Sequence, residues 1–129
     1  MTPAFAGTAE RLELDLAGQR LRIALERSGP RSAPLWLLLP ALSTVSTRSE
    51  WKPLAETVGD RRHLVSFDWP GFGDSDRPAI DYDASLLRSA LRAVLSYLRT
   101  THAGRITVVA AGHSASISLG LAAEWSKRW

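Results

Sequence analysis

The chain has 129 residues, of which 45% are apolar, and a formal net charge of +3. This length fits one small domain, and this apolar content is enough for a core, which excludes a disordered chain. Apart from the pairs Arg61-Arg62 and Lys127-Arg128 the basic residues are scattered. Without a basic stripe we expect no nucleic-acid partner.

The absence of cysteine excludes disulfides and thiolate metal sites, and it fits a reducing compartment. Residues 1–10 have neither a positive start nor an apolar run, so we expect no secretory signal. Apolar runs such as residues 35–39 are far below the roughly 20 residues that span a bilayer. These features predict a cytoplasmic, soluble protein with no membrane partner, no metal and no cofactor.

The first half of the chain predicts a hairpin, a strand and a helix. Residues 11–26 alternate between apolar and polar on both sides of Ala17-Gly18-Gln19, as in an antiparallel hairpin. The continuous apolar run 35–39 is typical of a strand covered on both faces of a parallel sheet. Apolar residues at helical spacing then predict a helix from about Ser49 to a stop at Gly59.

The second half continues the alternation. A strand is predicted at 63–67, an amphipathic helix from an N-cap at Asp83 to about Thr100, and a strand at 106–110. A last helix is expected from about Ala115 to Lys127. This order predicts one α/β domain with a mostly parallel sheet, an N-terminal antiparallel hairpin and helices on both faces.

The segment Gly112-His113-Ser114-Ala115-Ser116 nearly matches the nucleophile elbow G-x-S-x-G. In that motif the serine has a strained backbone at a sharp turn from strand to helix, so small residues must stand two positions before and after it. Gly112 fits the first position, and Ser116 is a small substitute for the usual second glycine. A tight turn of small residues that carries no chemistry is the alternative interpretation.

Four features in chain order resemble the N-terminal half of an α/β-hydrolase. They are the hairpin, the apolar strand that runs into Pro40, the loop "FDWPGFGDSDRP" at 67–78, and "GHSAS" at 112–116. Many relatives have His-Gly where this chain has Pro40-Ala41. The resemblance covers about Leu12 to Trp129 and implies a partial α/β-hydrolase fold in a single, truncated domain. It also implies a serine hydrolase that transfers an acyl group from an ester-type small molecule to water.

The resemblance also assigns roles to particular residues. It implies that Ser114 is the nucleophile and that the backbone N–H groups of Ala115 and Leu42 form the oxyanion hole. Ser43 is the next choice for the second donor. Ser43 and Trp69 are candidates to line a pocket.

A serine hydroxyl needs a base, and that base needs an orienting carboxylate. The family order is serine, then acid, then histidine, but after Ser114 this chain has only Glu124 and no histidine. His63 and His102 each precede a strand, which predicts that they lie about 16 Å from the serine edge of the sheet. The side chain of His113 is expected to point away from the adjacent Ser114. We therefore expect this chain alone to be inactive.

Acidic residues follow the strand 63–67, on the edge predicted for Ser114. An acid alone leaves the proton on serine, so Asp68, Asp74 and Asp76 are interpreted as loop-forming residues. Asp74 or Asp76 is expected to pair with Arg77.

The alternative function is a catalytically inactive fragment or a binding module that retains the elbow. Without further strands, the apolar strand 106–110 would lie unpaired at a sheet edge. Such an edge favours self-association and makes the isolated chain unstable.

Overall fold

The computed structural model describes residues 1–126, and it confirms the predicted order of strands and helices. The expected end of the last helix at Lys127 lies outside these residues. The helix expected from Ser49 is a short 3-10 turn followed by an α-helix. The elements are β1 (Thr8–Leu16), β2 (Gln19–Ser28), β3 (Leu35–Leu39), η1 (Arg48–Trp51), α1 (Lys52–Val58), η2 (Gly59–Arg61), β4 (His63–Phe67), α2 (Ala84–Thr101), β5 (Ile106–Ala110) and α3 (Ser114–Ser126).

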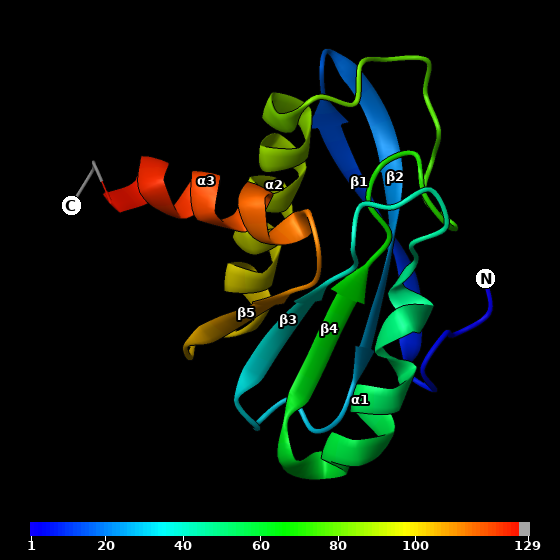
Figure 1. The fold of residues 1–129 in the computed structure, drawn as a ribbon. Coiled ribbons are helices and arrows are strands. Elements are labelled where there is room, and N and C mark those ends of the chain that lie inside the picture. The colour runs from blue at the N-terminus through cyan, green and yellow to red at the C-terminus, as the bar shows by residue number, and fades with distance from the viewer. Residues whose placement is uncertain (127–129) are drawn as a thin grey trace.

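The strands form one mixed sheet in the order β1-β2-β4-β3-β5 (Figure 1). β3 pairs in parallel with both β4 and β5, whereas β2 pairs antiparallel with β1 and with β4. Leu35 lies opposite both His63 and Ile106, so the three parallel strands start at the same level. Their carboxyl ends therefore meet at one edge, which parallel α/β sheets use for ligands.

Both residues of the hairpin turn have positive φ, a conformation that glycine adopts freely and alanine only with some strain. Ala17 and Gly18 have φ angles of 51° and 73°, the sign that a two-residue turn matched to strand twist requires. The turn leaves all nine residues of β1 paired with β2.

Helices cover both faces of the sheet, as predicted (Figure 1). On β3, Leu35, Leu37 and Leu39 belong to the cluster that contains the apolar face of α2. Leu38 belongs to a second cluster with Val58 of α1. This alternation follows from the two-residue period of a strand, so an uninterrupted apolar run serves both layers.

β1 and β5 are the two edge strands of the sheet. The edge position of β5 confirms the prediction for this strand. α3 follows β5, crosses α2 and extends away from the sheet (Figure 1). Within residues 1–126, no helix combines the length and apolar character needed to cross a membrane.

Candidate active site

The turn between β5 and α3 lies at the carboxyl edge of the parallel strands. Ala111 follows β5, and its N–H donates to the carbonyl of Leu39 at 3.2 Å. Gly112 then has a φ of 54°, and α3 begins at Ser114. A Cβ atom added to Gly112 would lie 3.1 Å from the Cβ of Ala41. The turn therefore packs against the start of the loop that follows β3.

Ser114 is completely buried at this turn, with a relative exposure of 0%. Its hydroxyl donates to the backbone carbonyls of Leu39, at 3.2 Å, and of Ala111. The hydroxyl has one proton, so the two carbonyls share it. The side chain thus faces into the protein rather than toward the open edge.

The strained backbone predicted for Ser114 is found at Gly112 instead. Among the described residues, Ala6 and Ala17 are the non-glycine residues with positive φ. Glycine has no Cβ, so a turn that needs this φ places it at least cost on Gly112. Gly112 and His113 are the exposed residues of the turn, and Ser114 behind them is buried.

The backbone donors expected to form the oxyanion hole differ in their availability. The N–H of Ala115 donates to the carbonyl of Gly112 at 3.2 Å, and the N–H of Ser116 donates to that of His113 at 3.1 Å. Both are used within the turn. The N–H of His113 has no acceptor among the described residues.

The loop after β3 offers the second donor. The N–H of Ala41 donates to the Glu50 carboxylate at 2.6 Å, and that of Ser43 donates to the Ser46 hydroxyl at 3.2 Å. The N–H of Leu42 has no acceptor in the part of the chain that the structure describes. Of the two candidates in this loop, Leu42 is therefore the one with a free donor.

The potential bases lie where the sequence predicts. His63 starts β4 and His102 follows α2, at the edge opposite Ser114. Glu124 is paired with Arg88, at 3.2 Å, and with Arg92. Between residues 1 and 126, His113 is thus the one histidine at the Ser114 edge, and its neighbouring hydroxyl is bonded to backbone carbonyls.

His63 has a structural role. Its Nδ1 donates to the carbonyl of Gly29 at 3.1 Å, and its Nε2 accepts from Arg27 at 3.2 Å, because an arginine can only donate. Burial lowers the pKa of His63, and the charges of Arg27 and Arg31 lower it further, whereas the Gly29 carbonyl opposes this effect. The imidazole is therefore held neutral.

Trp69 does not line an open pocket, which corrects the sequence prediction. Its side chain is fully buried, and its indole N–H donates to the carbonyl of Pro40 at 2.9 Å. The ring packs edge to face on Phe67. Trp69 thus joins the loop after β4 to the loop after β3. Ser43, the other pocket candidate, is exposed.

The acidic loop residues have different partners from those predicted. Arg77 donates to the carbonyls of Gly71 and Gly73, each at 3.0 Å. Asp76 faces Arg22 at 3.6 Å. Asp74 instead pairs with Arg48 at 3.1 Å, and the buried Asp68 also pairs with Arg48.

The structure reveals a buried charge cluster that the sequence did not indicate. The Arg48 side chain is only 2% exposed and contacts Glu26 and Asp68, both fully buried. Burial raises the pKa of Glu26, but N–H donors from Ala4, Phe5 and Gly7, together with Arg48, lower it by more, so the net pKa lies below its usual value. The residues of this charge cluster are far apart in the sequence and match no motif.

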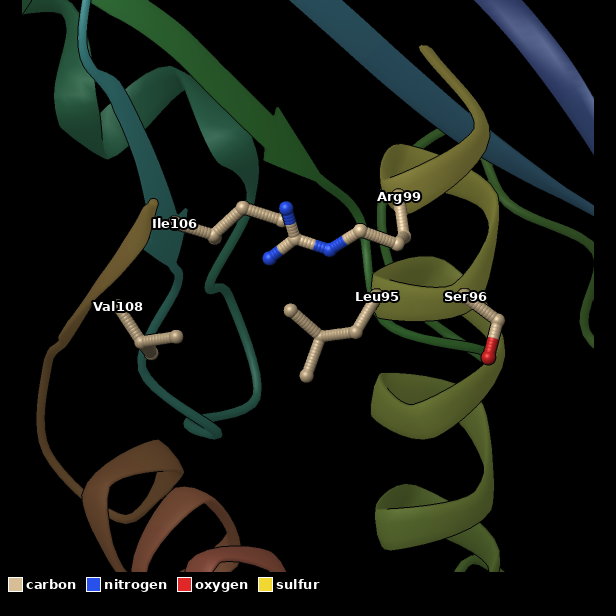
Figure 2. Close-up of a pocket in the computed structure, with 5 residues that line it drawn as sticks. All are labelled: Leu95, Ser96, Arg99, Ile106 and Val108. Atoms are coloured by element: carbon tan, nitrogen blue, oxygen red, sulfur yellow. The ribbon is translucent and has the colours of Figure 1, made fainter. Parts of the chain in front are cut away.

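One hollow of about 460 Å³ lies between α2 and β5 (Figure 2). Leu95 projects into it from α2, and Ile106 and Val108 line it from β5. Arg99 reaches across it and donates to the carbonyl of Gly104 at 2.6 Å. Ile106 starts β5, whereas Ser114 follows the end of that strand, so this hollow is separate from the elbow. Within the described residues, no group of three or more His, Asp or Glu side chains is placed to hold a metal ion.

A comparison with protein families adds to this geometry. The model of the alpha/beta hydrolase family matches residues 10–126. This chain belongs to the alpha/beta hydrolase family. The match includes the hairpin strands, the loop after β4 and the turn at Ser114, and the family consists of hydrolases. No curated protein matches the chain.

Solved structures of this family share the fold. A probable hydrolytic enzyme from Pseudomonas aeruginosa is 20% identical, with a TM-score of 0.77 over 95% of this chain and 39% of that one. A haloalkane dehalogenase from Agrobacterium tumefaciens is 22% identical, with a TM-score of 0.72 over 94% and 38%. A thermophilic esterase from Thermogutta terrifontis is 19% identical, with a TM-score of 0.71 over 91% and 42%.

The chain therefore spans about two fifths of the length of these structures. It is a partial α/β-hydrolase fold. The neighbours include a dehalogenase and an esterase, so similarity of fold does not select a substrate.

Proposed function

We propose that this chain is the nucleophile-bearing part of a serine hydrolase that acts on ester-type small molecules, and that it is catalytically silent by itself. The observation that carries the proposal is the position of Ser114. It stands at the turn after β5, at the carboxyl edge of the parallel strands and beside the loop after β3. Acyl-transfer enzymes of this family place their nucleophile at such a turn.

The chemistry expected of a serine at this place is acyl transfer. The Ser114 oxygen bonds to the carbonyl carbon of the ester while a base takes the hydroxyl proton, which then passes to the departing alcohol. Water next attacks the acyl group and gives its proton to the same base. The bond between the acyl carbon and the Ser114 oxygen then breaks, the base returns the proton to that oxygen, and the acid is released. The N–H of Leu42 supports this proposal because it is free to bind the negatively charged oxygen that forms in both steps. A serine also favours acyl transfer over the halide displacement that an aspartate nucleophile performs.

Two features account for the proposed lack of catalytic activity in this chain alone. The hydroxyl proton of Ser114 is shared between two carbonyls, so it points away from any base. The histidines other than His113 that the structure describes lie at the opposite edge, and Glu124 is held by two arginines. Activity would require a base from outside these residues and a turn that releases Ser114 and the N–H of Ala115.

The test is a comparison of esterase activity in two polypeptides. The 129-residue chain and its Ser114→Ala variant are expected to hydrolyse a short activated ester at the same background rate. A longer product of the same gene that carries an acid and a histidine downstream is expected to be active, and Ser114→Ala should abolish that activity. Full activity in the longer Ser114→Ala variant would refute the proposal.

A second candidate is a non-catalytic hydrolase-fold protein in which Ser114 is permanently structural. The observation that favours it is the exposed, positive-φ Gly112 at the apex of the turn, where a nucleophile would otherwise stand. The chain has no cysteine, so Ser114→Cys and His113→Cys each create a single thiol for labelling with a maleimide, and neither variant adds a Cβ to Gly112. In the 129-residue chain we expect the thiol at the exposed position 113 to react and the thiol at 114 to be protected.

The longer product distinguishes the two candidates. If Ser114 serves as the nucleophile, the thiol at 114 becomes reactive there. If Ser114 is structural, this thiol remains protected in both polypeptides, and the non-catalytic function stands.

A further inference from the structure

Arg48 directly follows the loop 40–47 and contacts four residues from three other parts of the chain: β2, the loop after β4 and the N-terminal residues. We infer that Arg48 is a positioning residue, which holds this loop and with it the free N–H of Leu42. The importance of that N–H rests on the function proposed above. The way in which the loop is held does not.

The first link joins the loop to the end of β4. The backbone N–H of Arg48 donates to one oxygen of Asp68 at 2.7 Å, and its guanidinium donates to the other oxygen. Asp68 directly follows β4 and is fully buried. One carboxylate therefore fixes both the backbone and the side chain of the residue that ends the loop.

The guanidinium of Arg48 makes the remaining contacts. Its Nε donates to Glu26 of β2 at 3.0 Å, its Nη1 also reaches Asp74 at 3.1 Å, and its Nη2 donates to the carbonyl of Thr2 at 3.0 Å. Glu26 in turn accepts hydrogen bonds from three backbone N–H groups near the N-terminus, those of Ala4, Phe5 and Gly7. Only the planar, five-donor fork of arginine can satisfy partners in these directions, and the single ammonium group of lysine cannot.

The other end of the loop is held by related contacts. The indole of Trp69 donates to the carbonyl of Pro40 at 2.9 Å. The N–H of Ala41 donates at 2.6 Å to Glu50, which belongs to η1, the same short helix that Arg48 starts. Leu42 thus directly follows Ala41, whose hydrogen bond to Glu50 depends on where η1 lies. The next residues of the loop, 43–45, are exposed.

A role in stability alone explains the cluster less well. The free energy lost when two charges leave water offsets most of the free energy gained from their attraction. A buried ion pair therefore often stabilises a fold no more than a well-packed apolar pair does. What the charged cluster adds is a defined geometry, because each acceptor fixes a direction of the guanidinium. That geometry determines where the loop ends relative to β4.

Amide hydrogen exchange of the 129-residue chain tests the inference. Arg48→Lys keeps the charge and loses the fork, and we expect the rates at Ala41, Ser43 and Ser46 to rise about tenfold while amides within the β2–β4 pairing change by less than about twofold. Arg22→Lys is the matched control. Arg22 is exposed and pairs with Asp76 of the loop after β4, so its loss should leave the three loop amides unchanged.

Two results would overturn the inference: a uniform rise across the sheet, which indicates a role in stability alone, or unchanged rates in the loop. If Arg48→Lys does not fold, Asp74→Asn loosens only the half-exposed contact, and about a threefold rise at the same amides is expected. No change in that variant also overturns the inference. Since exchange does not require Ser114 to react, failure of the proposed function leaves this test intact.

Discussion

The hydroxyl of Ser114 lies 3.2 Å from the carbonyl oxygen of Leu39, 75 residues earlier in the chain. Leu39 ends β3 and Ser114 starts α3, so this hydrogen bond connects α3 to an interior strand of the sheet. The residue that sequence pattern marks as a nucleophile thus has a structural bond in this chain. The bond can be measured without any substrate.

Ser114→Ala is expected to destabilise the chain. The variant loses the buried hydroxyl bond, which is worth about 1 kcal/mol. The cost stays near this value because each carbonyl keeps another donor: the N–H of Ala111 for Leu39, and the N–H of Ser114 itself for Ala111. Urea unfolding measures the difference. Ser116→Ala, at an exposed position of the same helix turn, should change stability by less than about 0.5 kcal/mol. Equal effects of the two variants would contradict the buried placement of Ser114.

Gly112→Ala is expected to cost about 2 kcal/mol, because it adds positive-φ strain and a close contact. The new Cβ would lie 3.1 Å from that of Ala41. Gly18→Ala is the matched control, since Gly18 also has positive φ but a Cβ there meets nothing within 4 Å. Urea unfolding should show a smaller loss for the control.

The contribution of the contact can be separated with a double variant. Ala41→Gly removes the opposing Cβ and should recover at least about 0.5 kcal/mol of the loss in Gly112→Ala. If Ala41→Gly recovers nothing, the turn does not pack on the loop in the way the structure shows.

The sequence predicts the elements well because their signals are local. Asp83 caps α2 through a bond from the N–H of Leu86, three residues away, and Gly59 ends α1 where expected. The position of the elbow turn was also predicted. The sequence does not predict the orientation of the Ser114 side chain. That orientation depends on whether residue 112 or residue 114 has the positive φ, and a turn of either kind can connect a strand to a helix.

The buried cluster could not be predicted from the sequence for a different reason. Arg48 lies 20 residues from Asp68, 22 from Glu26 and 46 from Thr2, and only the sheet order brings them together. A single arginine in a polar loop carries no periodicity. The buried Trp69 is a similar case, since its partner Pro40 is 29 residues away.

Stability is expected to fall as the pH drops below 6.5, the usual pKa of histidine. Burial and neighbouring arginines lower the pKa of His63 in the folded chain, so the unfolded chain takes up the proton first. The contribution of His63 is therefore present above pH 6.5 and is lost progressively toward its lower folded pKa. Urea unfolding at a series of pH values measures this slope. His63→Gln should flatten the slope, whereas Ser114→Ala should shift the curve without changing its slope. If the dependence of the unfolding free energy on pH is the same in His63→Gln, groups other than His63 cause it.

The two edges of the sheet differ in charge, and this difference predicts how the chain associates. β1 carries four charged residues, Glu10, Arg11, Glu13 and Asp15, whereas β5 carries none. Charged side chains on an edge strand oppose pairing with another chain, and an uncharged apolar edge permits it. The hollow beside β5 adds further apolar surface from Leu95.

We therefore expect the 129-residue chain to self-associate through β5 in a concentration-dependent way, measured by analytical ultracentrifugation. Thr107 is the exposed second residue of β5, so Thr107→Lys places a charge on the uncharged edge and should shift the chain toward the monomer. Thr8→Lys makes the same change at an exposed position of the opposite edge strand, β1, and should leave association unaltered. Association weakened equally by both variants would indicate a general effect of added charge. Association weakened by Thr8→Lys alone would place the contact at β1.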